Sequence, residues 1–385
     1  MTMGLIMKSS YYLQVPFLIF SAFWMNTYSK VEAAELPPGF TEVKITDELV
    51  NPTSFRFAPD GRIFVLQQGG QVRVIKNGVL LPEPFLSLSV DSRGEHGLLG
   101  IAFDPNFNLN PYVYIYYTAL TPAIHNRVSR FTVVGDRALE NSEKIVFELD
   151  NTGRSIFHSG GAIHFSRDGK LFLGVGDNAL RFGANAQDLS NPFGKILRIN
   201  IDGSIPEDNP FFKVAKDNGR ATWALGFRNP FTFHFQNGTD RMFANDVGAE
   251  SWEEINEVIA GQNYGWPLHE GTSDDPRFKA PIYTYAHGPV TSDTMGCAIT
   301  GGTFYDPVSP LYPKQYFGQY FFIDYCAGWM RILNPETHAV EPFGRQLASS
   351  PVSLEVGPDG KLYYLSLWYH GLYAISYEAP HPSPT

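Results

Sequence analysis

Short segments with alternating hydrophobic and polar residues recur along most of this chain, in the period-two pattern that predicts β-strands with one buried face. Three of these segments share one signal, an Asp-Gly turn leading into an apolar strand, at residues 59–64, 167–172 and 358–363. The Asp-Gly dipeptide favours a tight turn between antiparallel strands. The chain therefore repeats a hairpin signal.

The spacing of these hairpins predicts a repeating architecture. Their separations are close to two and four multiples of a repeat of roughly 50 residues, the length of one four-stranded propeller blade. Segments with the same strand rhythm but without Asp-Gly fill the gaps, at residues 98–133, 231–244 and 302–333. Six units result, and we predict an all-β fold, a six-bladed β-propeller of four-stranded antiparallel blades.

A propeller also has to close its ring, because an open sheet edge is exposed to aggregation. Residues 40–45 are predicted to add a strand to the last blade, beside a final strand at 371–376. Helical pattern is scarce, and we expect only a turn or two of helix at 251–257. The propeller should form a single domain over residues 34–378, followed by a disordered tail rich in Pro and His at 379–385.

The N-terminus is typical of a targeting segment. Lys8 precedes a largely apolar stretch, and small residues near Ala33 suit a signal peptidase, so residues 1–33 are predicted to be a signal peptide. Met7 is an alternative start. An N-terminal membrane anchor is the competing interpretation, but Gln14 and Pro16 interrupt an apolar core that is already short. The mature chain is thus expected to be periplasmic or secreted, without a membrane span.

Export changes how the two cysteines are interpreted, because thiols oxidise outside the cytoplasm. Cys297 and Cys326 form the only possible intrachain pair. We predict a disulfide between them that closes a loop of about 30 residues and stabilises the fold by a few kcal/mol. The alternative is two buried free thiols.

Composition narrows the function classes. The chain is 43% hydrophobic and 18% charged, which is ordinary for a soluble globular protein. A net charge of -10, with no run of basic residues, disfavours a nucleic-acid surface. There is no Gly-rich phosphate loop, dinucleotide fingerprint, nucleophile elbow or zinc-ligand spacing. These absences exclude most nucleotide-dependent chemistries.

Loops between strands carry the candidate chemistry. His158 precedes a Gly pair that opens a strand, and a histidine can act as a general base near neutral pH, although a structural or surface role is the common one. Asp177 ends the next strand of the same blade, where it either orients His158 or forms an Asx turn. Arg228 lies in an apolar run, so it needs an anionic or polarised partner.

A Gly-rich turn at Gly248 is followed by acidic residues. Ca²⁺ binds carboxylates and backbone carbonyls in flexible geometry, so this turn is a candidate cation site. The acids could equally form a solvated cluster or a helix N-terminus.

At these residues the chain resembles the glucose/sorbosone dehydrogenase family, whose characterised members are soluble quinoprotein sugar dehydrogenases. The matching stretches are residues 97–107, 158–161, 174–177, 191–200, 226–230, 246–267, 296–305 and 320–328. They are spread from about residue 40 to 375. The resemblance implies a six-bladed propeller that uses pyrroloquinoline quinone (PQQ) and Ca²⁺ to oxidise an aldose or related polyol and passes electrons to an external acceptor.

The resemblance also implies roles for individual residues. His158 would abstract the substrate hydroxyl proton, with Asp177 beside it and Arg228 polarising the quinone. The backbone carbonyls of Gly248 and Ala249 would bind Ca²⁺. The residues implied for cofactor binding are Arg228, Asn229, Glu95 and Gly248. A second, structural Ca²⁺ would be bound by Glu253 or Glu254 together with Tyr264.

The chain departs from the family pattern at the cofactor. Characterised members hold the quinone carboxylates with a lysine and paired arginines in the last two blades, but residues 324–328 and 349–353 contain no basic residue here. Glu95 and His96 stand where a polar amide is usual. Two alternatives therefore remain, a non-enzymatic sugar- or partner-binding propeller and a Ca²⁺-dependent sugar lactonase.

Overall fold

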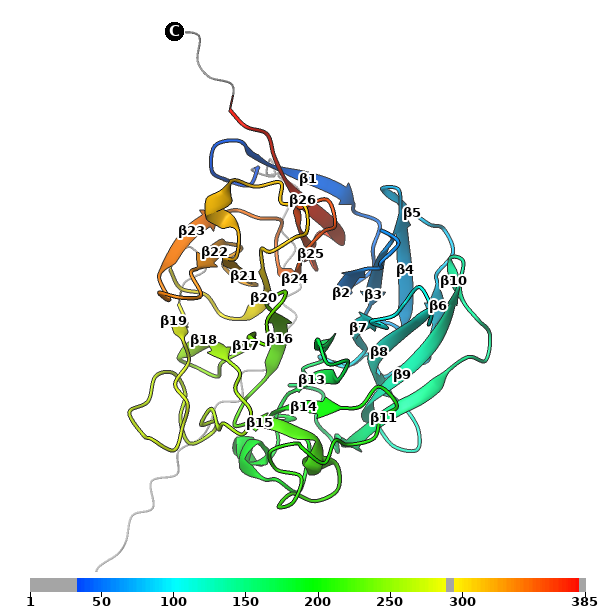
Figure 1. The fold of residues 1–385 in the computed structure, drawn as a ribbon, viewed down its shortest axis with the longest axis vertical. Coiled ribbons are helices and arrows are strands. Elements are labelled where there is room, and N and C mark those ends of the chain that lie inside the picture. The colour runs from blue at the N-terminus through cyan, green and yellow to red at the C-terminus, as the bar shows by residue number, and fades with distance from the viewer. Residues whose placement is uncertain (1–32, 289–293, 381–385) are drawn as a thin grey trace, which may run out of the picture. The chain divides into compact units, whose positions relative to one another are not determined.

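The computed structural model describes residues 33–288 and 294–380, so the predicted signal peptide up to Glu32 and the last five residues of the predicted tail lie outside it. In the described part, six antiparallel sheets surround a common axis (Figure 1). Each sheet places four strands side by side, and in two of the sheets a fifth strand also pairs with the third one. The predicted six-bladed β-propeller is confirmed.

The first three blades follow one another along the chain. The first contains β2 (Pro52–Phe57), β3 (Ile63–Gln67), β4 (Gln71–Lys76) and β5 (Val79–Leu80), with β6 (Leu86–Ser87) also on β4. The second contains β7 (Leu98–Phe103), β8 (Tyr112–Ala119), β9 (His125–Val134) and β10 (Arg137–Ala138), with β11 (Lys144–Asn151) also on β9. The third contains β12 (Ile163–Phe165), β13 (Leu171–Val175), β14 (Lys195–Ile199) and β15 (Thr222–Leu225).

The remaining blades complete the ring. The fourth contains β16 (Pro230–Phe235), β17 (Met242–Asp246), β18 (Trp252–Glu257) and β19 (Tyr283–Ala286). The fifth contains β20 (Ile299–Phe304), β21 (Tyr320–Asp324), β22 (Met330–Leu333) and β23 (Val340–Gly344). The sixth contains β24 (Pro351–Val356), β25 (Leu362–Ser366), β26 (Gly371–Tyr377) and β1 (Phe40–Thr46). Short 3₁₀ helices are η1 (Arg181–Gln187), η2 (Asp217–Ala221) and η3 (Lys314–Tyr316).

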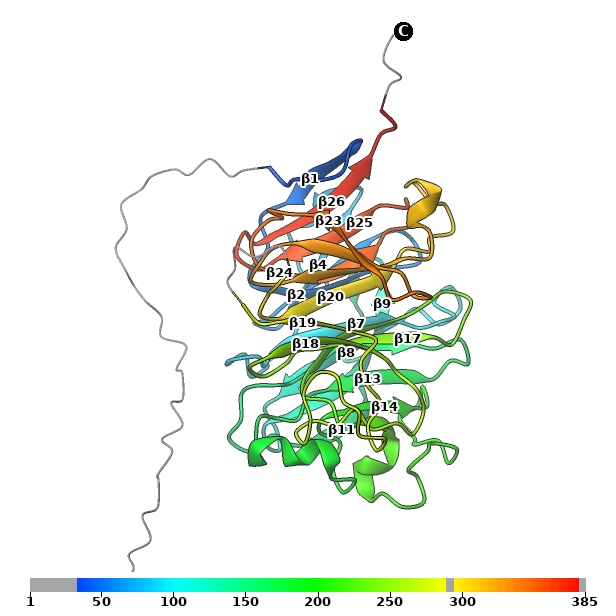
Figure 2. The same ribbon diagram turned by 90° about the vertical axis from the view of Figure 1, so that its left-hand side faces the viewer.

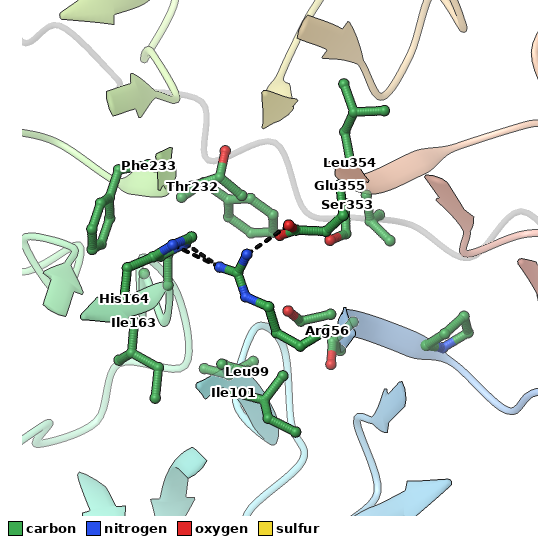
Figure 3. Close-up of a pocket in the computed structure, with 18 of the residues that line it drawn as sticks. Arg56, Leu99, Ile101, Ile163, His164, Thr232, Phe233, Ser353, Leu354 and Glu355 are labelled. Atoms are coloured by element: carbon green, nitrogen blue, oxygen red, sulfur yellow. Dashed lines mark hydrogen bonds and ion pairs between the residues drawn. The ribbon is translucent and has the colours of Figure 1, made fainter. Parts of the chain in front are cut away.

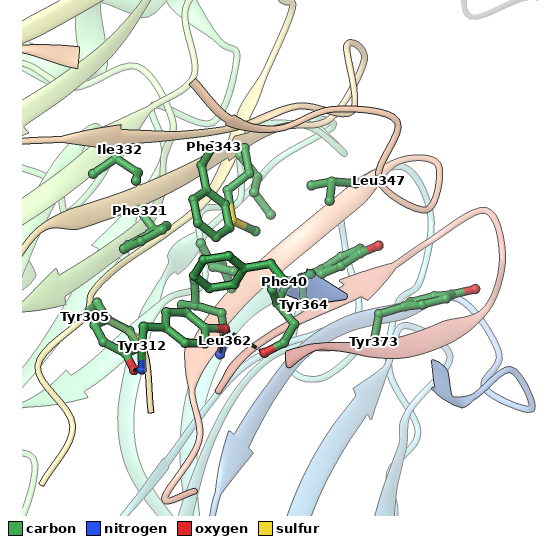
Figure 4. Close-up of a cluster of buried hydrophobic side chains, with 14 of the residues drawn as sticks. Phe40, Tyr305, Tyr312, Phe321, Ile332, Phe343, Leu347, Leu362, Tyr364 and Tyr373 are labelled. Carbon is green, nitrogen blue, oxygen red and sulfur yellow. Dashed lines mark hydrogen bonds between the residues drawn. The ribbon is translucent and has the colours of Figure 1, made fainter. Parts of the chain in front are cut away.

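The ring closes as the sequence predicts. Strand β1 pairs antiparallel with β26, from Phe40 opposite Tyr377 to Thr46 opposite Leu372, and the two lie side by side in both views (Figure 1 and Figure 2). Phe40 anchors this strand among aromatic rings, 4.8 Å from Tyr312 between centroids (Figure 4). The first described strand therefore covers the edge of the last one.

One element differs from the sequence-based prediction. Residues 251–257 do not form a turn of helix, because Trp252–Glu257 is strand β18, which pairs with β17 and β19. The prediction was wrong because its acids suggested a solvated segment. In the fold Glu253 and Glu254 are buried and hydrogen-bonded. Buried acids are compatible with a central strand only when such partners exist.

The hydrophobic core is divided among the blade interfaces. Each of six apolar clusters joins side chains from two neighbouring blades, for example Phe64 of the first blade with Phe103 of the second, whose ring centroids lie 5.0 Å apart. Packing of this kind stabilises the ring because every sheet buries both faces. Charged side chains lie at the central axis.

A partly buried cluster of charged and ionisable side chains crosses that axis. Arg56 of β2 donates to Glu355 of β24 over 2.6 Å and lies 2.8 Å from His164 of β12, between Nη2 and Nδ1 (Figure 3). His234 of β16 joins both charges at 3.1 Å from each. Four blades therefore meet at one guanidinium. We call these four residues the channel cluster.

The predicted disulfide is present. Cys297 and Cys326 are bonded, with 5.7 Å between their Cα atoms and 29 residues of sequence separation. The buried carboxylate of Asp324 accepts hydrogen bonds from the backbone of both cysteines and of the residue after each, and from the Tyr285 hydroxyl. The bridge is thus held by a local network. Within residues 33–288 and 294–380, no helix combines the length and apolar character needed to cross a membrane.

Candidate functional site

The predicted histidine and aspartate meet at one end of the third blade. His158 lies in the loop before β12 and Asp177 lies two residues after the end of β13, and their Nδ1 and Oδ1 atoms are 2.6 Å apart. Asp177 is buried, and its other oxygen accepts the indole N–H of Trp266 over 2.7 Å. The Ala179 N–H also binds Oδ1 over 2.7 Å. Asp177 therefore makes an Asx-type turn contact and contacts His158 as well.

Close backbone packing sets the position of His158. Its φ is 53°, in the left-handed region, and a Cβ added to Gly176 would lie 2.1 Å from the His158 carbonyl oxygen. Only glycine fits there. With Nδ1 engaged by Asp177, Nε2 makes no hydrogen bond to a described residue, and the side chain is 15% exposed. This nitrogen is therefore available for contact with a bound molecule.

Glu95 ties the histidine loop to the fourth blade. Its Oε2 accepts the His158 backbone N–H over 2.9 Å and the side-chain amide of Asn229 over 3.1 Å. Asn229 in turn accepts the Gly160 N–H through Oδ1 over 3.1 Å. Glu95 and Gly160 also line a cavity of about 210 Å³, whose lining includes Arg56 and Glu355. Figure 3 shows the part of this cavity around Arg56. The predicted cofactor residues Glu95 and Asn229 are therefore in contact with each other beside the histidine.

Arg228 is positioned by backbone contacts. Asp246 at the end of β17 accepts the N–H groups of Arg228 and Asn229, over 2.9 and 2.6 Å. The Arg228 guanidinium donates to the Val247 carbonyl over 3.0 Å and lies over the Trp266 ring, 5.7 Å from its centroid. Among the described acids none forms an ion pair with it. Its other N–H groups are available for a polarised ligand.

The Gly248 turn offers backbone oxygens. In the described part of the chain, the carbonyls of Gly248 and Ala249 accept no hydrogen bond. The four N–H groups that follow Gly248 point at one acid, since Oε1 of Glu270 accepts from Ala249, Glu250, Ser251 and Trp252 over 2.7, 3.3, 3.3 and 3.3 Å. Unpaired carbonyl oxygens are the donor type that Ca²⁺ prefers.

The two acids predicted for a second cation point in opposite directions, because neighbouring strand residues alternate between faces. Glu253 contacts His287 at 2.5 Å and accepts the N–H groups of Gly248 and Ile299, over 3.3 and 2.9 Å. Hydrogen bonding to Glu253 raises the pKa of His287.

Glu254 lies on the other face of β18, opposite Asp246. It accepts the Gly271 N–H over 2.6 Å and the Asn256 amide over 3.0 Å. Burial raises the pKa of Glu254 to about 7. Burial, with the charge of Glu254, raises the pKa of Asp246 well above its ordinary value. These two acids therefore resist being ionised together unless a cation joins them.

The Tyr264 hydroxyl makes no hydrogen bond to Glu253 or Glu254 and binds backbone groups instead. Its hydroxyl donates to the Glu257 carbonyl over 2.6 Å and accepts the Ile259 N–H over 2.9 Å. Its ring stacks on Phe227, with 4.5 Å between centroids. The backbone thus engages both functions of the hydroxyl. A second cation site that includes Tyr264 stays a prediction.

Several residues of the site had no clear signal in the sequence. Trp266 belongs to the aromatic Asn-Tyr-Gly-Trp-Pro corner, but its bond to Asp177 depends on packing between two blades. Glu270 and His287 stand in no recognisable motif. Lys195 is fully buried, and its Nζ donates to the carbonyls of Asn185 and Phe193 over 2.9 and 2.6 Å. Long-range pairing gives Trp266, Glu270 and His287 their contacts, whereas Lys195 binds carbonyls that are close to it in sequence.

Known proteins share this architecture and sequence. A sequence profile of the family described as Glucose / Sorbosone dehydrogenase matches residues 49–321. Quinoprotein glucose dehydrogenase B of Acinetobacter calcoaceticus is 30% identical over 323 residues, which cover 72% of this chain and 65% of that protein. Aldose sugar dehydrogenase YliI of Escherichia coli is 28% identical over 340 residues, covering 84% of this chain and 88% of that protein.

A solved structure agrees with these matches. The apo-form of the soluble aldose sugar dehydrogenase from Escherichia coli superimposes with a TM-score of 0.75 at 25% identity, covering 88% of this chain and all of that one. The matched region contains the loops that carry His158, Asp177, Arg228 and Gly248. The chain belongs to the glucose/sorbosone dehydrogenase family.

Proposed function

We propose that this protein is a sugar dehydrogenase that oxidises a hydroxyl group of an aldose or related polyol, with pyrroloquinoline quinone as the electron acceptor in the site and Ca²⁺ bound beside it. One observation carries the proposal. A histidine with a free Nε2, held by a buried aspartate, shares one end of the propeller with an arginine that has unused donors. Two relatives, a quinoprotein glucose dehydrogenase and an aldose sugar dehydrogenase, support it.

His158 is the proposed base. Because Asp177 engages Nδ1, Nε2 keeps a lone pair that would take the substrate hydroxyl proton. The carboxylate then stabilises the imidazolium that forms, and the Trp266 bond keeps the carboxylate in place. Proton transfer to a side-chain base typically contributes about 10²- to 10⁴-fold in rate.

The residues present are compatible with the two proposed groups. The unpaired carbonyls of Gly248 and Ala249 suit Ca²⁺, and Arg228 with Asn229 would hold the polar edge of the quinone. When bound, the quinone accepts two electrons and Ca²⁺ polarises its oxygen. Residues 324–328 and 349–353 supply no cation for its carboxylates, so we expect weaker quinone binding than a basic clamp gives.

The test is reconstitution. Purified protein is incubated with Ca²⁺ and the quinone, and reduction of an external dye is followed with a panel of aldoses and polyols. We expect sugar-dependent turnover that falls by at least about 100-fold in His158→Gln, while quinone binding, measured by calorimetry, is retained. Absence of both turnover and quinone binding in the wild type would overturn the proposal.

The missing basic residues favour one alternative, a propeller that binds a sugar or a partner without turnover. In that case sugar binding would be unchanged in His158→Gln and no dye would be reduced. Release of acid from a sugar lactone without any electron acceptor would instead identify a lactonase. We further propose export to the periplasm or the medium, which the Cys297–Cys326 disulfide supports because such bonds persist in oxidising compartments.

A further inference from the structure

We infer that Glu270 is a positioning residue for the Ca²⁺ site. By binding the N–H groups of the turn, Glu270 orients the carbonyl oxygens of Gly248 and Ala249 toward the cation. This inference rests on the proposed Ca²⁺ site. Glu270 lies on the loop after Trp266, outside the strands, and is half-buried. Its carboxylate does not contact His158, Asp177 or Arg228 through any hydrogen bond in the described part of the chain. Its contacts are with the backbone of the turn.

The direction of the carbonyls follows from the planarity of the peptide bond. In a trans peptide, the C=O of one residue and the N–H of the next point in opposite directions. The N–H of Ala249 points at Oε1 of Glu270 over 2.7 Å, so the C=O of Gly248 points away from Glu270. The N–H of Glu250 points at the same oxygen over 3.3 Å, and the C=O of Ala249 therefore also points away.

Neighbouring contacts show which groups of the turn already have hydrogen-bond partners. The carbonyl of Val247, one residue earlier, accepts the guanidinium of Arg228 over 3.0 Å. The Gly248 N–H is drawn to Glu253 over 3.3 Å, so carboxylates also take this donor. Near Arg228, the N–H groups of the turn are therefore bound by carboxylates, whereas the carbonyl oxygens of Gly248 and Ala249 have no partner in the described part of the chain. A cation is the ligand type that needs such an arrangement.

Tight packing leaves the turn little freedom to find this shape in another way. A Cβ on Gly248 would lie 1.8 Å from the Trp252 carbonyl oxygen and 2.9 Å from Oε1 of Glu270. The carboxylate therefore sits directly under the glycine. Four N–H groups converging on one anionic oxygen form an anion-binding concavity, and here the anion is part of the protein.

The test measures Ca²⁺ binding directly, by calorimetry on the purified full chain without quinone or sugar. Glu270→Ala removes the acceptor, Glu270→Gln keeps an oxygen without the charge, and Glu250→Ala is the matched control, because Glu250 is an exposed acid of the same turn. We expect the Kd to rise at least about tenfold in Glu270→Ala, which is typical of groups that orient metal ligands. It should rise less in Glu270→Gln and little in Glu250→Ala.

Each outcome decides the inference. If Glu270 were itself a ligand, Glu270→Gln would lose as much affinity as Glu270→Ala, and the positioning role would be refuted. A lower urea midpoint for Glu270→Ala with an unchanged Kd would show a purely structural residue and would also refute it, while leaving the cation site intact. If the wild type binds no Ca²⁺, the proposed cation site fails and the inference fails with it.

Discussion

The channel cluster makes a strong prediction about stability. Arg56 and Glu355 lie 2.6 Å apart across the axis, with side chains 18% and 11% exposed. Glu355→Gln removes one charge and leaves the guanidinium facing His164 and His234 in a largely buried space. Breaking a buried ion pair in this way costs about 3–5 kcal/mol of unfolding free energy. Because glutamine still accepts a hydrogen bond, we expect a loss near 3 kcal/mol.

The pH dependence of this loss follows from the pKa of Glu355. Burial alone would raise it, but the charges of Arg56 and His234 outweigh burial and hold it below its ordinary value of 4.5. A carboxylate with a lowered folded-state pKa stabilises the protein above its unfolded pKa and loses that contribution as pH falls through the folded value. The difference between wild type and Glu355→Gln should thus be full at pH 7 and shrink below about pH 4.5.

The assay is urea denaturation at a series of pH values, followed by tryptophan fluorescence. Glu341→Gln, at an exposed acid of β23, is the matched control and should change stability by less than about 0.5 kcal/mol. The double variant Arg56→Met with Glu355→Met should recover most of the lost stability, since a buried pair can be exchanged for apolar groups. A loss below about 1 kcal/mol in Glu355→Gln at pH 7 would show that solvent screens the pair and would refute this reasoning.

Three further predictions concern stability. Burial lowers the pKa of Lys195 to about 7 in the folded protein, so between pH 7 and 10 the unfolded chain holds a proton on Lys195 that the folded protein lacks. The urea midpoint of wild type should therefore rise with pH over this range relative to that of Lys195→Met. Equal pH dependence of the two midpoints would contradict this. Hydrogen bonding to Glu253 raises the pKa of His287, so its stabilising effect over His287→Gln should be present below pH 6.5 and fade above it, and a constant difference would argue against the ion pair. Replacing Cys297 and Cys326 with serine should cost about 3–4 kcal/mol, measured by urea titration of the oxidised wild type and the double variant; equal midpoints would refute a stabilising bridge.

Much of the fold was predictable from local sequence patterns, namely alternating strands and turn residues. The Asp-Gly hairpin at residues 59–64 became the turn between β2 and β3, and the closing strand at 40–45 became β1. These elements were predictable because strand alternation and turn chemistry depend on neighbours in sequence. The disulfide was predictable because Cys297 had only one possible partner. His158, Asp177 and Arg228 were placed in loops for the same local reasons, and the resemblance supplied their roles.

Tertiary structure decided the rest, because the decisive partners are distant in sequence. Strand β18 was mistaken for a helical turn, since its buried acids have hydrogen-bond partners, among them His287, Gly271 and Ile299, that lie far away in sequence. Arg56 and Glu355 are 299 residues apart, and neither lies in a motif that predicts their contact. The sequence by itself determined how many blades form and how the ring closes. Ring closure then decided which charges meet at the axis, because only the complete ring brings four inner strands to one point.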